Sequence, residues 1–175
     1  MILSGCRSQS APAPGLEQDS SRSIPAAQIP TSFSELAPGD TASVVLIMRR
    51  TMADIDGAAA DFTKRDTTLA PEPGQEPRRL TLWLEDNVPR KLLVTEPDES
   101  GRMMRESLFY FVQGEVRVVM QPNDGYAFDA DRILVWTDEA LIPLADVTPE
   151  LRMQRESEVL DQAHKWLALF GVELP

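Results

Sequence analysis

Cysteine, histidine and long apolar runs are all scarce in this sequence. One cysteine among 175 residues cannot close an intrachain disulfide, and one histidine cannot build a metal site of several histidines. The longest apolar runs, such as residues 44–48, span five residues, far fewer than the roughly 20 that a bilayer-spanning helix needs. An internal disulfide, a histidine-based metal cluster and a membrane-spanning helix within this sequence are therefore excluded.

Basic charge is scarce as well. The chain carries 17 Lys+Arg against 28 Asp+Glu, for a formal net charge of -11 and a pI near 4.5. Nucleic-acid binding takes most of its affinity from basic groups, so we expect no nucleic-acid partner. Fourteen of the basic residues are arginines, and the only lysines are Lys64, Lys91 and Lys165.

Sequence signatures of catalysis and nucleotide binding are missing. There is no Walker loop, Gly-x-Gly-x-x-Gly, Cys-x-x-Cys or Gly-x-Ser-x-Gly. The sole histidine, His164, follows Asp161 by three residues on a predicted helix, where a solvated side chain is favoured over a catalytic one. Residues 54–57 (DIDG) lack the ligand spacing of a complete calcium loop. We therefore predict no metal, no cofactor and no enzymatic activity.

The N-terminus carries a short motif, Leu3-Ser4-Gly5-Cys6. It resembles the lipobox of bacterial lipoproteins, which implies that Cys6 is the lipidated first residue of the mature protein. A secretory signal has a basic start and an apolar stretch of about 7–15 residues, whereas only five residues precede Cys6. We interpret residues 1–6 as the end of a signal peptide that begins upstream of Met1; the alternative is an accidental match on an unanchored tail.

The segment after Cys6 has the composition of a tether. Residues 7–32 are rich in Ser, Pro, Ala and Gln and have no apolar periodicity, so they cannot bury enough surface to offset their ordering entropy. A single domain is expected from residue 33 to 175. Arg7 follows the cysteine where inner-membrane lipoproteins resemble one another in carrying Asp, which favours the outer membrane, facing the periplasm.

The domain is expected to begin and end with a helix. Asp40 is the predicted N-cap of the first helix. It precedes an apolar stripe at helical spacing, formed by Val44, Met48, Met52, Ile55, Ala59 and Phe62. Thr148-Pro149-Glu150 starts the last helix, and Gly171 is expected to stop it. The apolar face of this helix is predicted to consist of Leu151, Leu160, Ala163, Leu167 and Phe170.

Short apolar segments separated by turns fill the region between the helices. The predicted strands cover 80–84, 91–96, 106–112, 115–121, 126–128 and 132–136. The gaps between them are too short for parallel crossovers, so a consecutive antiparallel meander is favoured. The sequence thus predicts an α+β domain with five or six strands, in which the C-terminal helix packs on the sheet and both helices cover one face of it.

Two segments of this predicted sheet resemble small bacterial lipoproteins and exported proteins of unassigned function. They are Leu108-Phe109-Tyr110-Phe111, followed by Gln113-Gly114-Glu115-Val116, and a strand with Tyr126, Phe128, Arg132, Ile133, Leu134 and Trp136. The resemblance implies a location in the cell envelope and an architecture, and it carries no catalytic residue.

Four aromatic residues are candidates for a binding surface: Trp83, Tyr110, Tyr126 and Trp136. Trp83 lies on the strand face opposite Leu80, Leu82 and Leu84, so either a helix covers it or it belongs to an exposed patch; coverage by a helix is favoured. The leading hypothesis is a lipid-anchored envelope protein with a structural or binding role and an envelope protein partner. The alternative is a soluble periplasmic module that binds a small ligand or a protein.

Overall fold

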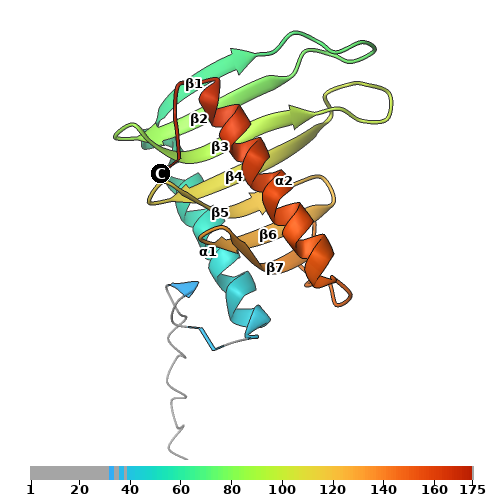
Figure 1. The fold of residues 1–175 in the computed structure, drawn as a ribbon. Helices are drawn as coiled ribbons and strands as arrows, with labels where there is room; N and C mark the ends of the chain where they lie inside the picture. The colour runs from blue at the N-terminus through green and yellow to red at the C-terminus, as the bar shows by residue number, and fades with distance from the viewer. Residues whose placement is uncertain (1–31, 34–35, 38, 175) are drawn as a thin grey trace, which may run out of the picture.

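The computed structural model describes residues 32–33, 36–37 and 39–174. Two helices enclose one antiparallel sheet, which confirms the α+β class (Figure 1). The helices are α1 (Thr41–Ala58), followed by the short 3-10 helix η2 (Ala59–Asp61), and α2 (Pro149–Ala168). The strands are β1 (Thr63–Thr68), β2 (Arg79–Glu85), β3 (Val88–Glu96), β4 (Arg105–Val112), β5 (Glu115–Met120), β6 (Asp124–Asp129) and β7 (Arg132–Asp138).

The sheet is the consecutive meander that the turn spacing predicts. Its strand order is β1 to β7, and each strand is antiparallel to the next. Asp86 and Asn87 have φ of 49° and 66°, and Gln113 and Gly114 have φ of 56° and 84°, as two-residue turns between antiparallel strands require. The prediction of five or six strands is wrong because the sheet has seven. The missed strand, β1, is TKRDTT, which lacks the apolar alternation that marks a half-buried strand.

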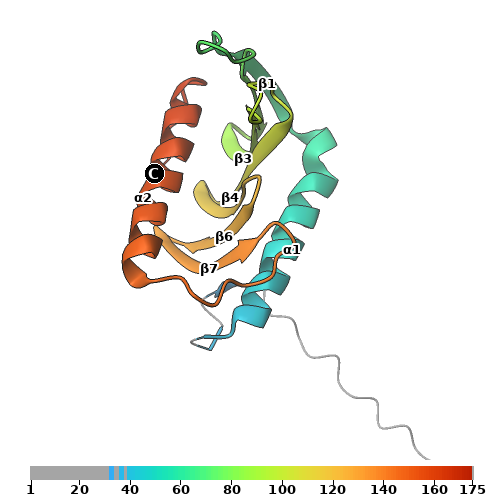
Figure 2. The ribbon, with the colours of Figure 1, turned by 90° about the vertical axis from the view of Figure 1, so that its right-hand side faces the viewer.

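The two helices lie on opposite faces of the sheet (Figure 2), so the prediction that both cover one face is wrong. The reason lies in the central strands, which bury residues on both sides: Phe109 and Phe111 pack on the side of α2, and Tyr110 packs on the side of α1. A sheet that is apolar on both faces needs a layer on each of them.

The core on the α2 side is the larger one. The three leucines of β2 are at most 1% exposed and pack with the buried face of α2, formed by Val159, Ala163, Trp166 and Leu167. Leu151, predicted on this face, is 43% exposed. On the opposite side, Val44, Ile47, Met48 and Ile55 of α1 pack against β4 to β7.

Side-chain caps fix where both helices begin. Asp40 accepts a hydrogen bond from Ser43 N at 3.0 Å, as predicted. Thr148 accepts one from Leu151 N at 3.2 Å. Helix α2 ends earlier than predicted, at Ala168, and Gly171 has a φ of 68° after it.

None of the helices within the described residues combines the length and apolarity that crossing a membrane takes.

Candidate functional site

The four candidate aromatic residues do not form one surface. Tyr126 and Trp136 lie on the α2 side, where they are 0% and 7% exposed and their ring centroids are 5.3 Å apart. Trp83 and Tyr110 lie on the α1 side, because each alternates along its strand with residues buried under α2. The sheet therefore divides the predicted surface into two separate places.

Trp83 lies on a part of the sheet that α1 does not cover. Helix α1 packs on β4, β5, β6 and β7, and the same face of β1, β2 and β3 keeps its side chains exposed or half-exposed. The favoured coverage of Trp83 by a helix is thus not found within the described residues. We call this surface the open face. Cross-strand pairing arranges it in the rows Lys64–Trp83–Lys91 and Asp66–Thr81–Leu93. A third row consists of Thr68, paired with Arg79, and Thr95, whose hydroxyl accepts from Arg79 N at 2.9 Å.

Two of the three lysines of the chain flank Trp83. The Nζ atoms of Lys64 and Lys91 lie 5.8 Å and 5.3 Å from the centroid of its ring, within the range of a cation–π contact. Each ammonium also has a carboxylate partner: Lys64 with Asp66 at 3.5 Å and Lys91 with Asp56 at 2.6 Å. The open face thus carries the indole ring of Trp83 and two ammonium groups, each of which is paired with a carboxylate.

Asp56 connects the C-terminal end of α1 to the sheet. One carboxylate oxygen pairs with Lys91, and the other accepts a hydrogen bond from the Tyr110 hydroxyl at 3.2 Å. Burial raises the pKa of Tyr110 well above its usual value, and the negative charge and hydrogen bond of Asp56 add to this rise. Lys91 also lies 5.3 Å from the Tyr110 ring centroid. Trp83, Lys91 and Tyr110 therefore form one connected cluster at the border between α1 and the open face.

A cavity of about 570 Å³ continues the open face at its other end. It is lined by Thr68, Glu76, Pro77, Arg79, Thr95 and Met103. Two loops form its wall, since Glu76 N donates to Gly101 O at 2.9 Å and Glu76 Oε2 accepts from Met103 N at 2.9 Å. The guanidinium of Arg79 has no partner among the described residues, so it is available to a bound molecule.

A second cavity, which we call the polar pocket, lies beside α2 and has a volume of about 330 Å³. Its lining consists of Arg78, Glu96, Pro97, Arg105, Ser107, Gln121, Pro122, Asn123, Asp124 and Gln162. Arg78 Nη2 pairs with Glu96 Oε2 at 3.3 Å, and Ser107 Oγ donates to Glu96 Oε1 at 3.2 Å. Burial raises the pKa of Glu96, while Arg78 and the Ser107 hydrogen bond oppose the rise.

The buried aromatic pair borders this polar region. Trp136 Nε1 donates to Asp124 Oδ1 at 2.7 Å. The Tyr126 hydroxyl is buried without a hydrogen-bond partner among the described residues. Its pKa is raised, first by burial and then by the charge of Asp124. Tyr126 and Trp136 thus belong to the core and to the support of the polar pocket.

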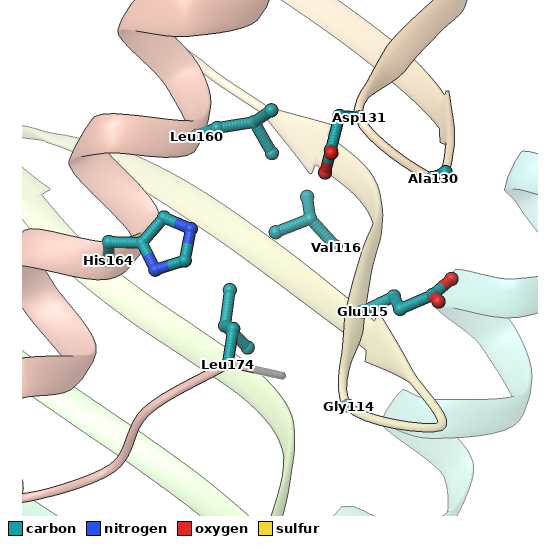
Figure 3. Close-up of a pocket in the computed structure, with 8 residues that line it drawn as sticks. All are labelled: Gly114, Glu115, Val116, Ala130, Asp131, Leu160, His164 and Leu174. Carbon is teal, nitrogen blue, oxygen red and sulfur yellow. The ribbon is translucent and has the colours of Figure 1, made fainter.

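His164 borders a third and smaller cavity of about 170 Å³ (Figure 3). Leu160 and His164 of α2 lie on one side, and Asp131 in the turn between β6 and β7 lies on the other. His164 makes no hydrogen bond or ion pair with a described residue, and Asp161 interacts instead with Ser157 Oγ at 3.5 Å. The cavity holds a single histidine with no base or nucleophile bonded to it.

No group of three or more His, Cys, Asp or Glu within the described part of the chain is placed to hold a metal ion. Leu3, Ser4, Gly5 and Cys6, together with almost all of the predicted tether, lie outside the described residues.

Sequence reasoning named Trp83 and Tyr110 as candidates and did not name the charged residues beside them, Asp56, Lys64 and Lys91. The scarcity of lysine was a signal for two of them, since pairing of β1, β2 and β3 brings two of only three lysines to one tryptophan. No feature of the sequence singled out Arg78 and Glu96 of the polar pocket as candidate site residues.

Comparison of the chain with protein-family models, with curated proteins and with solved structures finds no match in any of the three.

Proposed function

We propose that this protein is a non-enzymatic domain of the bacterial cell envelope, anchored by lipid at Cys6, and that it binds an envelope protein through the open face. The observation that carries the binding role is Trp83, half-buried on an uncovered sheet face between two lysines. The anchor rests on the sequence Leu3-Ser4-Gly5-Cys6, and the absence of Asp at position 7 favours the outer membrane.

The chemistry of the open face suits a protein partner. Tryptophan is enriched at the centres of protein interfaces, where polar groups surround it. Here Leu93 adds apolar surface, and the hydroxyls of Thr81 and Thr95 add polar groups. Three strands about 4.8 Å apart and about 13 Å of strand length give a patch around Trp83 that is smaller than the roughly 800 Å² each partner contributes to a standard interface. We expect surrounding loops to supply the remaining contact area.

The net charge explains why such a domain needs a covalent anchor. An acidic domain is repelled by anionic lipid headgroups, and the chain carries a formal charge of -11. Two or more acyl chains anchor a protein stably without any electrostatic attraction.

Metabolic labelling tests the anchor. The gene is expressed with its natural upstream region in the presence of a lipid precursor. We expect label on the wild type and none on Cys6→Ser, with Ser8→Ala as a matched control that keeps the label. An unlabelled wild type, or a labelled Cys6→Ser variant, contradicts the anchor.

Site-specific photo-cross-linking tests the binding face. A photoreactive residue at Leu93, on the open face, is compared with one at Arg65, which lies on β1 but points to the other side of the sheet. We expect a discrete cross-linked protein only from position 93, and its loss in Trp83→Ala. Equal cross-linking at both positions, or cross-linking unaffected by Trp83→Ala, refutes the proposed face.

A further inference from the structure

We propose that the polar pocket beside α2 binds a small zwitterion, a molecule of amino-acid or dipeptide size that carries one carboxylate and one ammonium group. This inference does not rest on the proposed anchor or on the open face, because the pocket lies on the other side of the sheet. It is a binding site for a small polar molecule and involves no covalent step.

The pocket lies beside α2, where the apolar core on that side of the sheet ends. Along the α2 side of the sheet, the apolar core gives way to one row of polar residues at the ends of four strands: Glu96, Ser107, Gln121 and Asp124. Arg78, which precedes β2, also lines the pocket. On α2, Gln162 Oε1 accepts a hydrogen bond from Gln121 Nε2 at 2.9 Å. Each residue of this row is hydrogen-bonded or paired with a neighbour, as polar groups between a helix and a sheet must be. The row therefore forms a polar lining whose side chains are held in place before a ligand binds.

The charges of the pocket are balanced and separated. Arg78 and Arg105 lie at one end with Glu96, and Asp124 lies at the other end, on β6. Strands β4 and β6 are two strand spacings apart, or about 10 Å. The net charge of the four groups is zero, in a chain whose overall charge is -11. A ligand that complements both ends is neutral overall and carries both signs.

The guanidinium of Arg105 is free to receive the carboxylate. It has no hydrogen bond or ion pair with any described residue, whereas Arg78 is already paired with Glu96. Arg105 is opposite Glu96 in the strand register, so its side chain starts from the cavity wall. An arginine fork binds a carboxylate through two parallel hydrogen bonds.

Asp124 is placed to receive the ammonium group. Its Oδ1 atom accepts from Trp136 Nε1, which fixes the side chain, and a carboxylate has capacity for further donors. The side-chain carbonyl of Gln121, whose amide nitrogen donates to Gln162 Oε1, offers a further acceptor beside it.

Two prolines and one cation–π contact restrain the walls of the pocket. Pro97 and Pro122 have fixed φ angles, and Trp166 lies 5.3 Å below the guanidinium of Arg78. Binding to a pre-organised cavity loses less entropy. The volume of about 330 Å³ lies at the small end of the range for ligand sites, which fits an amino acid or a dipeptide.

The test is an NMR titration of the full 175-residue chain at pH 7 with alanine, alanyl-alanine, propionate and ethylamine. Propionate lacks the ammonium group and ethylamine lacks the carboxylate. We expect one of the two zwitterions to shift the amide resonances of Ser107, Gln121 and Gln162, and both single-charge analogues to bind at least about tenfold more weakly. Which zwitterion binds more tightly distinguishes an amino-acid site from a dipeptide site.

Substitutions at Arg105 and Asp124 test which side chain binds which charged group of the ligand. Arg105→Gln and Asp124→Asn are each expected to weaken binding of the zwitterion at least about tenfold; Asn keeps the acceptor for Trp136. The matched control is Arg79→Gln, because Arg79 also has a free guanidinium but lies on the opposite face, and it should stay within about twofold of the wild type. No shift with either zwitterion up to about 10 mM, or equal affinity in Arg105→Gln and wild type, overturns the proposal.

Discussion

Removal of the Asp56 carboxylate is expected to loosen the C-terminal end of α1 from the sheet. Asp56→Ala leaves the buried hydroxyl of Tyr110 and the ammonium of Lys91, whose side chain is 14% exposed, without their shared acceptor. A hydrogen bond to a charged group contributes about 1.5–3 kcal/mol. The ion pair contributes at most about 1 kcal/mol, since the Asp56 side chain is 45% exposed. The expected loss of unfolding free energy is about 2 kcal/mol.

Urea denaturation measures this loss. With a slope of about 2 kcal/mol per molar urea, the midpoint of Asp56→Ala should fall by about 1 M. Asp54→Ala is the matched control on the same helix, because among the described residues Asp54 pairs only with Arg50, at 3.5 Å and exposed. Both substitutions gain the same helix propensity, so the difference between them reports the contacts of Asp56.

A double-mutant cycle with Tyr110→Phe tests the mechanism. Tyr110→Phe removes only the hydroxyl and should cost about 1 kcal/mol. If Asp56 stabilises the fold through that hydroxyl, the double variant costs less than the sum of the single variants by about 1 kcal/mol. Strict additivity, or an Asp56→Ala variant within about 0.5 kcal/mol of Asp54→Ala, refutes the reasoning.

Three further predictions follow from burial and from backbone packing. The chain has only two tyrosines, Tyr110 and Tyr126, and both have pKa values raised in the folded state. Stability should therefore fall above about pH 10 by about 2.7 kcal/mol per pH unit. Tyrosinate absorbance should rise only with loss of the near-UV circular dichroism; a tyrosinate step near pH 10 in folded protein contradicts this. Gly125→Ala should lower the unfolding free energy by about 2 kcal/mol, measured by heat or urea, because an added Cβ would lie 2.5 Å from a threonine hydroxyl oxygen. Gly57→Ala on α1, where an added Cβ meets open space, should raise it by about 0.5–1 kcal/mol. Equal effects of the two substitutions would contradict the packing around Gly125. Because the folded-state pKa of Glu96 is raised, its stabilising contribution is present at low pH and is lost as pH rises through that pKa. The unfolding free energy of Glu96→Gln relative to wild type should therefore increase between pH 4 and pH 7, and a decrease would contradict burial as the main cause.

The elements with apolar periodicity were predictable from the sequence, and the others were not. The stripe that begins at Val44 predicted the first helix, but it ran on to Phe62, whereas α1 ends at Ala58 and Phe62 is extended. The alternation of residues 80–84 predicted β2 and its buried face. Strand β1 was not predicted because both of its faces are polar. It forms by pairing with β2, and local patterns carry no information about a partner strand.

The sequence failed to predict which face of the sheet each helix covers, for a related reason. An apolar stripe shows that a helix needs a partner surface, but it does not say which face of the sheet supplies it. Strands β4 to β7 are apolar on both sides, so each helix has a face to cover. The same arrangement separates Trp83 from Trp136, two residues that the sequence alone placed on one surface.

The entry of the chain into the domain relates the open face to the proposed anchor. Phe33, the first buried residue among those that the structure describes, has the guanidinium of Arg117 on β5 5.5 Å from its ring centroid. It packs with Val44 and Val135 in the core on the α1 side. The chain thus enters over β5 to β7, whereas the open face lies on β1 to β3, toward the other edge of the sheet (Figure 1). In the proposed anchored form, the segment that leads from Cys6 joins the domain over β5 to β7, and Trp83 lies toward the other edge of the sheet.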